Sequence, residues 1–597
     1  MPRKPKTGTA EKRSARHKPG HRLDRQLNTL EGSGLIDVAQ MMPELEYLFR
    51  HALIQDAAYE SMLKADRRIL HRAIGETLER LYPEQLSELA ARLGHHFALA
   101  GEAERARKYF ILAGDSALAV YANVEAEQHY RAALNWATSG ADKARALAGL
   151  GEVLDGQSRF EEAIQVWRES ILFYQELQDD DTVARLYARS ARTAWSAGDF
   201  QRGLTLAREG LAAVANSPAT LGKALLLHDV GRACMFNQMK AEGLPLCDQA
   251  LAIAEQLADV EAQADILSTL GTMLEPDRQL DQCVETLSKA AELADATQSL
   301  RVAFRTHHNL GQKLYNIRGD LRAGRDHLLR ASEICRLMGN VANEFHNFSH
   351  TALAVLFLGD FVAVEAMLPT LQQLWRAIPD PTPYQIWLGA VEALLLRYRG
   401  ELTEAVVTLR ACYAQARQPS NPEWQYAIAL LFAEALLEAG ETQEAGRIST
   451  DFLELFAEEP WGGVVTARCV LSAMHLREGR IEEARRPLVE AREKFGSQIT
   501  AFEAEDLSLA EARLAVAEKR WPEALAAFEA TAQMQARMDK RWYRAQTLRE
   551  WAEAHLSRNE PGDRDHAREL LNESLALFEE MNVPKYAALV GNRIQSL

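Results

Sequence analysis

The sequence contains few of the residues that interrupt or cross-link a folded chain. Only 19 of its 597 residues are proline and six are cysteine. No two cysteines form a CxxC motif, and each falls in a helical pattern where free cysteine packs as a small apolar residue. This usage fits a reducing compartment rather than a disulfide-stabilised secreted scaffold. The six are Cys234, Cys247, Cys283, Cys335, Cys412 and Cys469.

Long apolar runs are also absent. No run approaches the ~20 residues that a helix needs to span a bilayer. The N-terminus lacks the apolar segment of a secretory signal. We therefore expect a soluble chain without a membrane partner, located in the cytoplasm.

Negative charge outweighs positive charge outside the first 25 residues. The net charge is −16, yet residues 1–25 carry nine Lys or Arg against Glu11 and Asp24, which leaves −23 for the rest. An acidic body argues against a broad phosphate-binding surface. The basic segment itself is nearly free of apolar residues, which predicts a disordered tail over 1–25. The alternative is an electrostatic handle for nucleic acid or an acidic partner.

Small residues recur every 40 or so positions from about residue 140 onward. A second small residue follows each one, usually 12 positions later. Two antiparallel helices approach closely only where small side chains face each other, so the pattern predicts stacked helical hairpins. The first series is Gly151, Ala191, Gly231, Gly271, Gly311, Ala352, Ala393, Ala433, Ser472, Ala512 and Ala552. The second is Ala163, Gly203, Gly243, Cys283, Ala323, Val364, Ala405, Ala445, Ala484, Ala524 and Ala567.

The turns repeat with the helices. Glycines followed by a charged residue, mostly acidic, stand between helical patterns, where a left-handed cap can end one helix and a carboxylate can start the next. They are Gly198, Gly319, Gly359, Gly400, Gly440 and Gly479. We predict an all-α, right-handed superhelical solenoid of about eleven hairpins of 40 residues, an array covering residues 136–597.

Residues 26–135 have helical patterns outside this register. We expect one amphipathic helix that starts at Leu45 within LEYLFRHALIQDAAYESML, and four more over 67–81, 86–100, 104–119 and 124–137.

The repeat resembles the tetratricopeptide (TPR) family. Leu147, Leu150, Gly151 and Ala163 match that motif position by position. The family period is 34 residues, so a period of 40 implies longer helices. The family's usual terminal proline is mostly missing here.

A second resemblance covers residues 26–135. The strings FRHAL, QDAAY, RR and LH between Phe49 and His71 resemble the junction in bacterial signalling ATPases with repeat tails, including class III adenylate or guanylate cyclases fused to an ATPase and MalT-like regulators. The resemblance implies a winged-helix remnant over 26–135. It also places the family's nucleotide-sensing histidine at His51. The other interpretation is that His51 is a helix-start residue packing near Tyr47.

The catalytic parts of that family are not found in the sequence. No GxxxxGK[ST] loop is present to hold phosphates. The nearest string, from Ser217 to Ala224, lacks the first Gly and the final Ser or Thr. We therefore predict no enzymatic activity, no catalytic residue and no cofactor.

Polar and aromatic residues on the first helices of two hairpins are the candidates for partner binding. Ordinary packing between hairpins is the alternative. They are Phe304, His308, Tyr315, Asn343, Asn347 and His350. His346 and His350 have a spacing that can hold a metal, but no third ligand is evident, and no metal site is predicted.

These observations favour a non-catalytic protein-interaction or ligand-sensing scaffold that binds a peptide or protein in its concave groove. One alternative is a DNA-associated transcriptional regulator that uses the basic tail, through which alone nucleic acid would bind. Another is the tail subunit, acting in trans, of a separately encoded ATPase or adenylate cyclase.

Overall fold

The computed structural model describes residues 20–40, 46–237, 239–417, 422–457 and 462–597. It divides into two compact units, 1–112 and 113–597. The predicted boundary near residue 135 falls inside the second unit. Among the described residues, no helix has both the length and the apolar character needed to cross a membrane.

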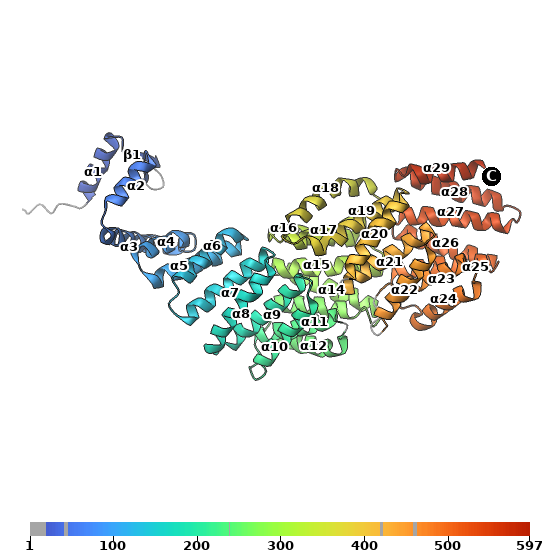
Figure 1. The fold of residues 1–597 in the computed structure, drawn as a ribbon, viewed down its shortest axis with the longest axis horizontal. Helices are drawn as coiled ribbons and strands as arrows, with labels where there is room; N and C mark the ends of the chain where they lie inside the picture. The colour runs from blue at the N-terminus through green and yellow to red at the C-terminus, as the bar shows by residue number, and fades with distance from the viewer. Residues whose placement is uncertain (1–19, 41–45, 238, 418–421, 458–461) are drawn as a thin grey trace, which may run out of the picture. The chain divides into compact units, whose positions relative to one another are not determined.

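The first unit combines helices with a short antiparallel hairpin of two strands (Figure 1). Ile36 pairs with Phe49, and Asp37 at the edge forms an ion pair with Arg50 at 2.7 Å. Its elements are α1 (Gly20–Gly32), β1 (Ile36–Gln40), β2 (Glu46–Phe49), α2 (Ala52–Ser61), α3 (Lys64–Leu81), the 3-10 turn η1 (Pro83–Gln85), α4 (Ala90–Ala100) and α5 (Ala103–Ala119), which ends in the second unit.

The expected helix from Leu45 is wrong in its first part. Residues 46–49 form strand β2, and the helix starts only at Ala52. Tyr47, Leu48 and Phe49 favour a strand when a partner strand is available, and β1 supplies that partner. The predicted tail falls mostly on residues 1–19, outside the described residues, while residues 20–25 belong to α1.

After the end of α5, the second unit contains α6 (Asn123–Asn135) and then eleven stacked helical hairpins, as predicted (Figure 1). A final helix, α29 (Pro584–Gln595), follows the last hairpin. The hairpins are α7 (Gly140–Gly156) with α8 (Phe160–Glu176), α9 (Asp180–Ser196) with α10 (Phe200–Ala213), α11 (Leu221–Phe236) with α12 (Lys240–Gln256), α13 (Val260–Met273) with α14 (Leu280–Asp295), α15 (Leu300–Lys313) with α16 (Leu321–Leu337), α17 (Val341–Phe357) with α18 (Phe361–Ala377), α19 (Gln385–Tyr398) with α20 (Leu402–Ala416), α21 (Pro422–Ala439) with α22 (Thr442–Leu455), α23 (Val464–Arg477) with α24 (Ile481–Phe495), α25 (Ala501–Ala517) with α26 (Trp521–Arg537), and α27 (Arg541–Arg558) with α28 (Asp563–Glu580). The all-α TPR-like solenoid is confirmed.

The small residues separate the two helices of each hairpin. A Cβ atom on Gly151 would lie 2.2 Å from Nε1 of Trp167, and one on Gly231 would lie 2.4 Å from Sγ of Cys247. Every residue of the first series is buried. In the second series the exception is Ala323, which is only half-buried.

A π-helical segment, η2 (Leu314–Arg318), explains this exception. It inserts an extra residue at the end of α15, so that Gly324 rather than Ala323 faces the seam. A Cβ atom on Gly311 would lie 2.9 Å from the carbonyl oxygen of Gly324. The same insertion agrees with the spacing from Gly311 to Ala352, which is 41 rather than 40.

Substituting Gly271 with leucine tests the role of the seam. A Cβ atom there would lie 2.8 Å from Cγ of Leu287, so Gly271→Leu should overpack the hairpin and lower the free energy of unfolding by ~1–3 kcal/mol. Gly591→Leu is the matched control, because Gly591 is also helical and has open space around its Cα. Equal urea midpoints for the two variants would contradict the spacer role.

Successive turns of the solenoid touch each other. The Tyr384 hydroxyl donates to the carbonyl oxygen of Ser196 at 3.1 Å across 188 residues, and Arg278 pairs with Glu503 across 225 residues. Arg541 Nε donates to the carbonyl oxygen of Leu358 at 2.9 Å across 183 residues. With a repeat of 40 residues, these separations correspond to roughly five hairpins per turn.

Glycine allows this approach at two of the predicted turns. Gly319 and Gly359 have φ of +71° and +78°. A Cβ atom on them would lie 2.5 Å from Met538 and 2.7 Å from Met581, respectively. The left-handed caps predicted from the sequence therefore also make room for the neighbouring turn.

Candidate functional site

A cavity of about 590 Å³ lies within the array, lined mainly by residues from the end of α5 to α19 and also by Phe456, directly after α22. Most of its wall comes from the first helices of successive hairpins, which repeat the same register. Five lining residues directly follow a small seam residue, and five more lie three positions later. The first group is Glu152, Arg192, Arg232, Thr272 and Gln312. The second is Asp155, Trp195, Met235, Glu275 and Tyr315.

The structure places all six candidate binding residues on this one cavity: Phe304, His308, Tyr315, Asn343, Asn347 and His350. Tyr315 belongs to the π-helical segment η2, and π-helical segments are frequent at functional sites. That these residues bind a partner remains a prediction.

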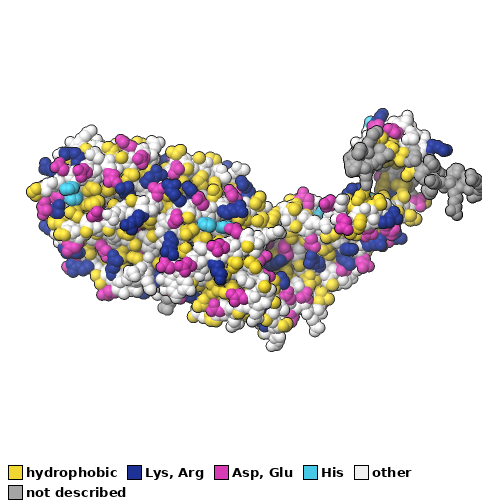
Figure 2. Space-filling view, turned by 180° about the vertical axis from the view of Figure 1, so that it is seen from behind, with side chains coloured by type: hydrophobic (Ala, Val, Ile, Leu, Met, Phe, Trp, Pro, Cys, Tyr) yellow, Lys and Arg dark blue, Asp and Glu magenta, His cyan; other side chains and the backbone are white. Residues whose placement is uncertain are grey.

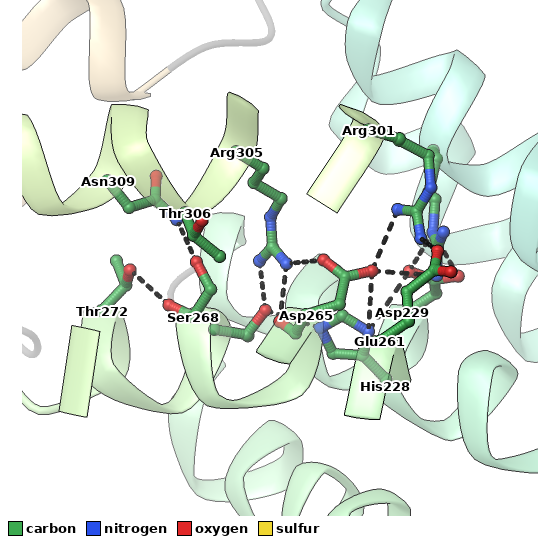
Figure 3. Close-up of polar contacts among 12 residues, drawn as sticks. His228, Asp229, Glu261, Asp265, Ser268, Thr272, Arg301, Arg305, Thr306 and Asn309 are labelled. Atoms are coloured by element: carbon green, nitrogen blue, oxygen red, sulfur yellow. Dashed lines mark hydrogen bonds and ion pairs between the residues drawn. The ribbon is translucent and has the colours of Figure 1, made fainter. Parts of the chain in front are cut away.

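Asp265 on α13 organises the polar contacts beside the cavity (Figure 3). Its carboxylate pairs with Arg305 and, at 3.0 Å, with Arg301. Arg192 Nη2 lies 3.6 Å away on the other side. Burial alone would raise the pKa of Asp265, but these guanidinium groups outweigh burial and hold the pKa well below its usual range. Asp265 is therefore an ionised, fully buried anchor for three cations.

The cavity wall carries more positive than negative charge. Six lining residues are basic and three are acidic, although the chain as a whole is acidic. The face of the array in Figure 2 differs from this, because Lys and Arg are intermixed there with Asp and Glu. The basic residues are Arg189, Arg192, Arg232, Arg301, Arg305 and Lys313, and the acidic ones are Glu152, Asp155 and Glu275.

Arg232 differs from the other basic residues of the wall. Its guanidinium lies over the rings of Trp195 (4.9 Å) and Phe236 (5.6 Å). Its Nε is shielded from water and has no hydrogen-bond partner, and no carboxylate of the described residues lies within ion-pair distance. Burial, and then the charge of Arg305, lower the pKa of Arg232 well below its usual range, although the more distant carboxylates of Asp265 and Asp229 act in the opposite direction.

A histidine cluster occupies another part of the wall. Asn347 Nδ2 donates to the carbonyl oxygen of Asn343 at 2.8 Å, which leaves Asn347 Oδ1 to accept from His308 Nδ1 at 2.8 Å. His308 Nε2 then accepts from Gln312 Nε2 at 3.1 Å, and the same amide nitrogen lies 3.3 Å from His350 Nε2.

This network assigns the tautomer of His350. Because its Nε2 accepts from Gln312, the proton of the neutral ring is on Nδ1. That N–H has no acceptor among the described residues, although His350 is only 4% exposed. The wall therefore holds a second donor that lacks a partner.

The histidines should make the array sensitive to acid. Burial lowers the pKa of His308 to about 4, and burial and neighbouring histidines lower the pKa values of His346 and His350 well below their usual range. The unfolded chain, with ordinary values near ~6.5, binds protons first as the pH falls. The free energy of unfolding should therefore decrease between about pH 6.5 and 4. Replacing the three histidines with glutamine should flatten this dependence in urea titrations. An equally steep curve would contradict it.

Of the other predicted features, His51 is not a lining residue of this cavity, whereas His346 and His350 are. His51 is exposed at the N-cap of α2 and makes no capping hydrogen bond. His346 and His350 lie close together beside His308, but among the described residues no group of three His, Cys, Asp or Glu side chains could hold a metal ion.

Sequence reasoning missed the remaining wall residues, notably Trp195, Arg232, Tyr384 and Trp387. A signal for Arg232 was present, because polar residues recur directly after the small seam residue from Glu152 to Gln312. No comparable signal marks Tyr384 or Trp387, which reach the cavity through the contact between turns.

The chain matches no known protein-family model. An uncharacterised protein of Rhizobium meliloti (strain 1021) is 30% identical over 136 residues, which are 22% of this chain and 13% of that protein. The chain therefore spans only a small part of that relative, and the match assigns no family.

Three solved structures share a general likeness with the chain. The Cut9–Hcn1 hetero-tetramer of APC/C has a TM-score of 0.46 at 15% identity, covering 90% of this chain and 95% of the other. A Rap protein complexed with Competence and Sporulation Factor has 0.41 at 13%, covering 63% and 96%. Yeast Tom70 has 0.33 at 13%, covering 78% and 99%. All three TM-scores are below 0.5, so these structures assign neither a family nor a function to the chain. The assignment therefore rests on the chain's own geometry: a TPR-like array around a polar, aromatic cavity.

Proposed function

We propose that this chain is a non-catalytic scaffold or sensor that binds a short peptide segment in the cavity of the array. One observation carries the proposal: successive first helices present the same register positions to a single cavity. Its volume of about 590 Å³ is within the range of ligand sites in proteins.

The lining chemistry favours a peptide. Amide side chains, each with a donor and an acceptor, match the two hydrogen-bonding groups of a peptide unit. Aromatic rings beside them offer surfaces for apolar side chains. The amides include Asn309, Gln312, Asn316, Asn340 and Asn343, and the rings include Trp167, Trp195, Phe304, Tyr315 and Trp387.

Narrowing the cavity tests this function. The full-length protein would be screened against pooled hexapeptides by affinity selection, with binders confirmed by calorimetry. Asn343→Trp, on the wall, should weaken them at least tenfold. Glu333→Trp, on the exposed face of α16, should not. Absence of binders, or binding that is insensitive to Asn343→Trp, would refute the proposal. ATP is expected neither to bind nor to be hydrolysed.

Exposed apolar side chains in the first unit favour a second candidate function, the trans-acting tail of a separately encoded ATPase or cyclase. Leu53 is 81% exposed, Leu63 72%, and Leu48 and Ile69 64% each. Such a surface is typical of a protein interface. Mixing the protein with a purified ATPase of the resembling class should give a complex in size-exclusion chromatography. Leu53→Asp with Leu63→Asp should abolish it, whereas Asn343→Trp should not.

A further inference from the structure

The cavity holds donors without acceptors. Among the described residues, several N–H groups of the wall are shielded from water and lack a hydrogen-bond partner. They include Arg232 Nε, Arg305 Nε and His350 Nδ1. Buried donors of this kind are normally satisfied, so a ligand that suits this space should be rich in acceptors.

The repeat itself shows which partner Arg232 lacks. Arg192, at the same register position one hairpin earlier, donates from Nε to both oxygens of Asp229, at 2.7 and 2.8 Å. Asp229 lies 37 residues after Arg192, and 37 residues after Arg232 the chain has Thr269. The Thr269 hydroxyl contacts Arg305 and, at 2.6 Å, His228. The carboxylate that neutralises Arg192 therefore has no counterpart for Arg232.

We propose that a carboxylate of the bound peptide supplies the missing counterion of Arg232. This inference rests on the proposed function and specifies its ligand as an acidic peptide. The guanidinium offers a planar fork suited to a carboxylate, and its position over Trp195 and Phe236 keeps that fork in place. An apolar residue beside the acidic one would contact the same rings, while His350 Nδ1–H would donate to a second acceptor of the peptide.

The carboxylate could belong to an acidic side chain or to the peptide C-terminus. Peptide pairs in which Asp or Glu is replaced by Asn or Gln test whether a side chain supplies the carboxylate. Peptide pairs with a free or an amidated C-terminus test whether the C-terminus supplies it. Each pair would be titrated by calorimetry into the full-length protein.

Two variants assign the contact. Arg232→Gln removes the charge at the cavity. Arg208→Gln removes an equal charge from an exposed pair with Glu242 on the neighbouring helices α10 and α12. The wild-type protein and Arg208→Gln should prefer the carboxylate peptide at least tenfold. Arg232→Gln should lose the preference while binding the amide peptide within twofold of wild type. Equal binding of both peptides by wild type, or a preference that survives Arg232→Gln, would overturn the inference.

A small anion gives an independent readout. Citrate, which binds the folded state if the site accepts carboxylates, should raise the melting temperature of wild type and Arg208→Gln but not of Arg232→Gln. Arg232→Lys, which keeps the charge, should retain part of the increase if the first variant folds poorly. Stabilisation by citrate without any peptide binder would refute the peptide function and retain the anion site. Peptide binding in the cavity without any preference for a carboxylate would retain the peptide function and refute the anion site.

Discussion

Glu503→Ala is expected to lower the free energy of unfolding by about 3–5 kcal/mol, since it breaks a buried ion pair. Glu503 on α25 is 1% exposed, and its carboxylate accepts from Arg278 Nη1 at 2.5 Å and Nη2 at 3.2 Å. It also accepts from the backbone N–H of Gly463 at 2.9 Å and of Thr500 at 3.0 Å. The substitution removes the carboxylate that pairs with the charge of Arg278, and it leaves the two backbone amides without their acceptor.

The measurement is urea unfolding followed by circular dichroism. Glu493→Ala, at an exposed position of α24, should change stability by less than about 0.5 kcal/mol. The double variant Arg278→Met with Glu503→Leu should recover only the part of the loss that comes from the unpaired charge of Arg278, because the backbone amides of Gly463 and Thr500 still lack their acceptor. A loss below 1 kcal/mol for Glu503→Ala, in the range of a surface pair, would show that this contact does not hold the turns together.

Asp265→Asn is expected to lower the free energy of unfolding by about 3 kcal/mol. It should also increase the rise in melting temperature that added anions cause. The substitution keeps the shape of the side chain but removes the charge that pairs with Arg305 and Arg301 and lies 3.6 Å from Arg192 Nη2. The cavity then becomes more positive. Citrate should consequently raise the melting temperature of Asp265→Asn more than that of wild type.

Asp248→Asn is the matched control, since Asp248 is exposed on α12. It should change neither the stability nor the citrate effect. A destabilised Asp265→Asn with an unchanged response to citrate would mean that its carboxylate is purely structural. Differential scanning fluorimetry over a series of citrate concentrations measures both quantities.

The sequence pattern predicted the array well because each hairpin depends mainly on its own small residues. Gly151 against Trp167 is a local constraint, visible as a spacing. The strand at residues 46–49 was missed because its stability comes from pairing with β1, which a helical pattern does not show. The π-helical segment at Leu314–Arg318 left only a weak trace, a spacing of 41 instead of 40.

The cavity was predictable only in part. Phe304, His308 and Asn347 share one face of neighbouring first helices, so periodicity brought them together. Tyr384 reaches the same space because its hydroxyl contacts Ser196 across 188 residues. That contact depends on the small rotation between hairpins, which no single repeat encodes. The missing partner of Arg232 became visible only beside the Arg192–Asp229 pair.

The contact between Tyr384 and Ser196 can form only after synthesis of the chain has passed residue 384. Translation at about 5–20 residues per second needs about 10–40 s to add the 188 residues that separate them. During that interval the hairpins that carry Arg192 and Arg232 can already form, while the wall opposite them has not been synthesised. The cavity is therefore completed late in synthesis. A ligand can bind in it only after more than half of the chain, up to at least Tyr384, has left the ribosome.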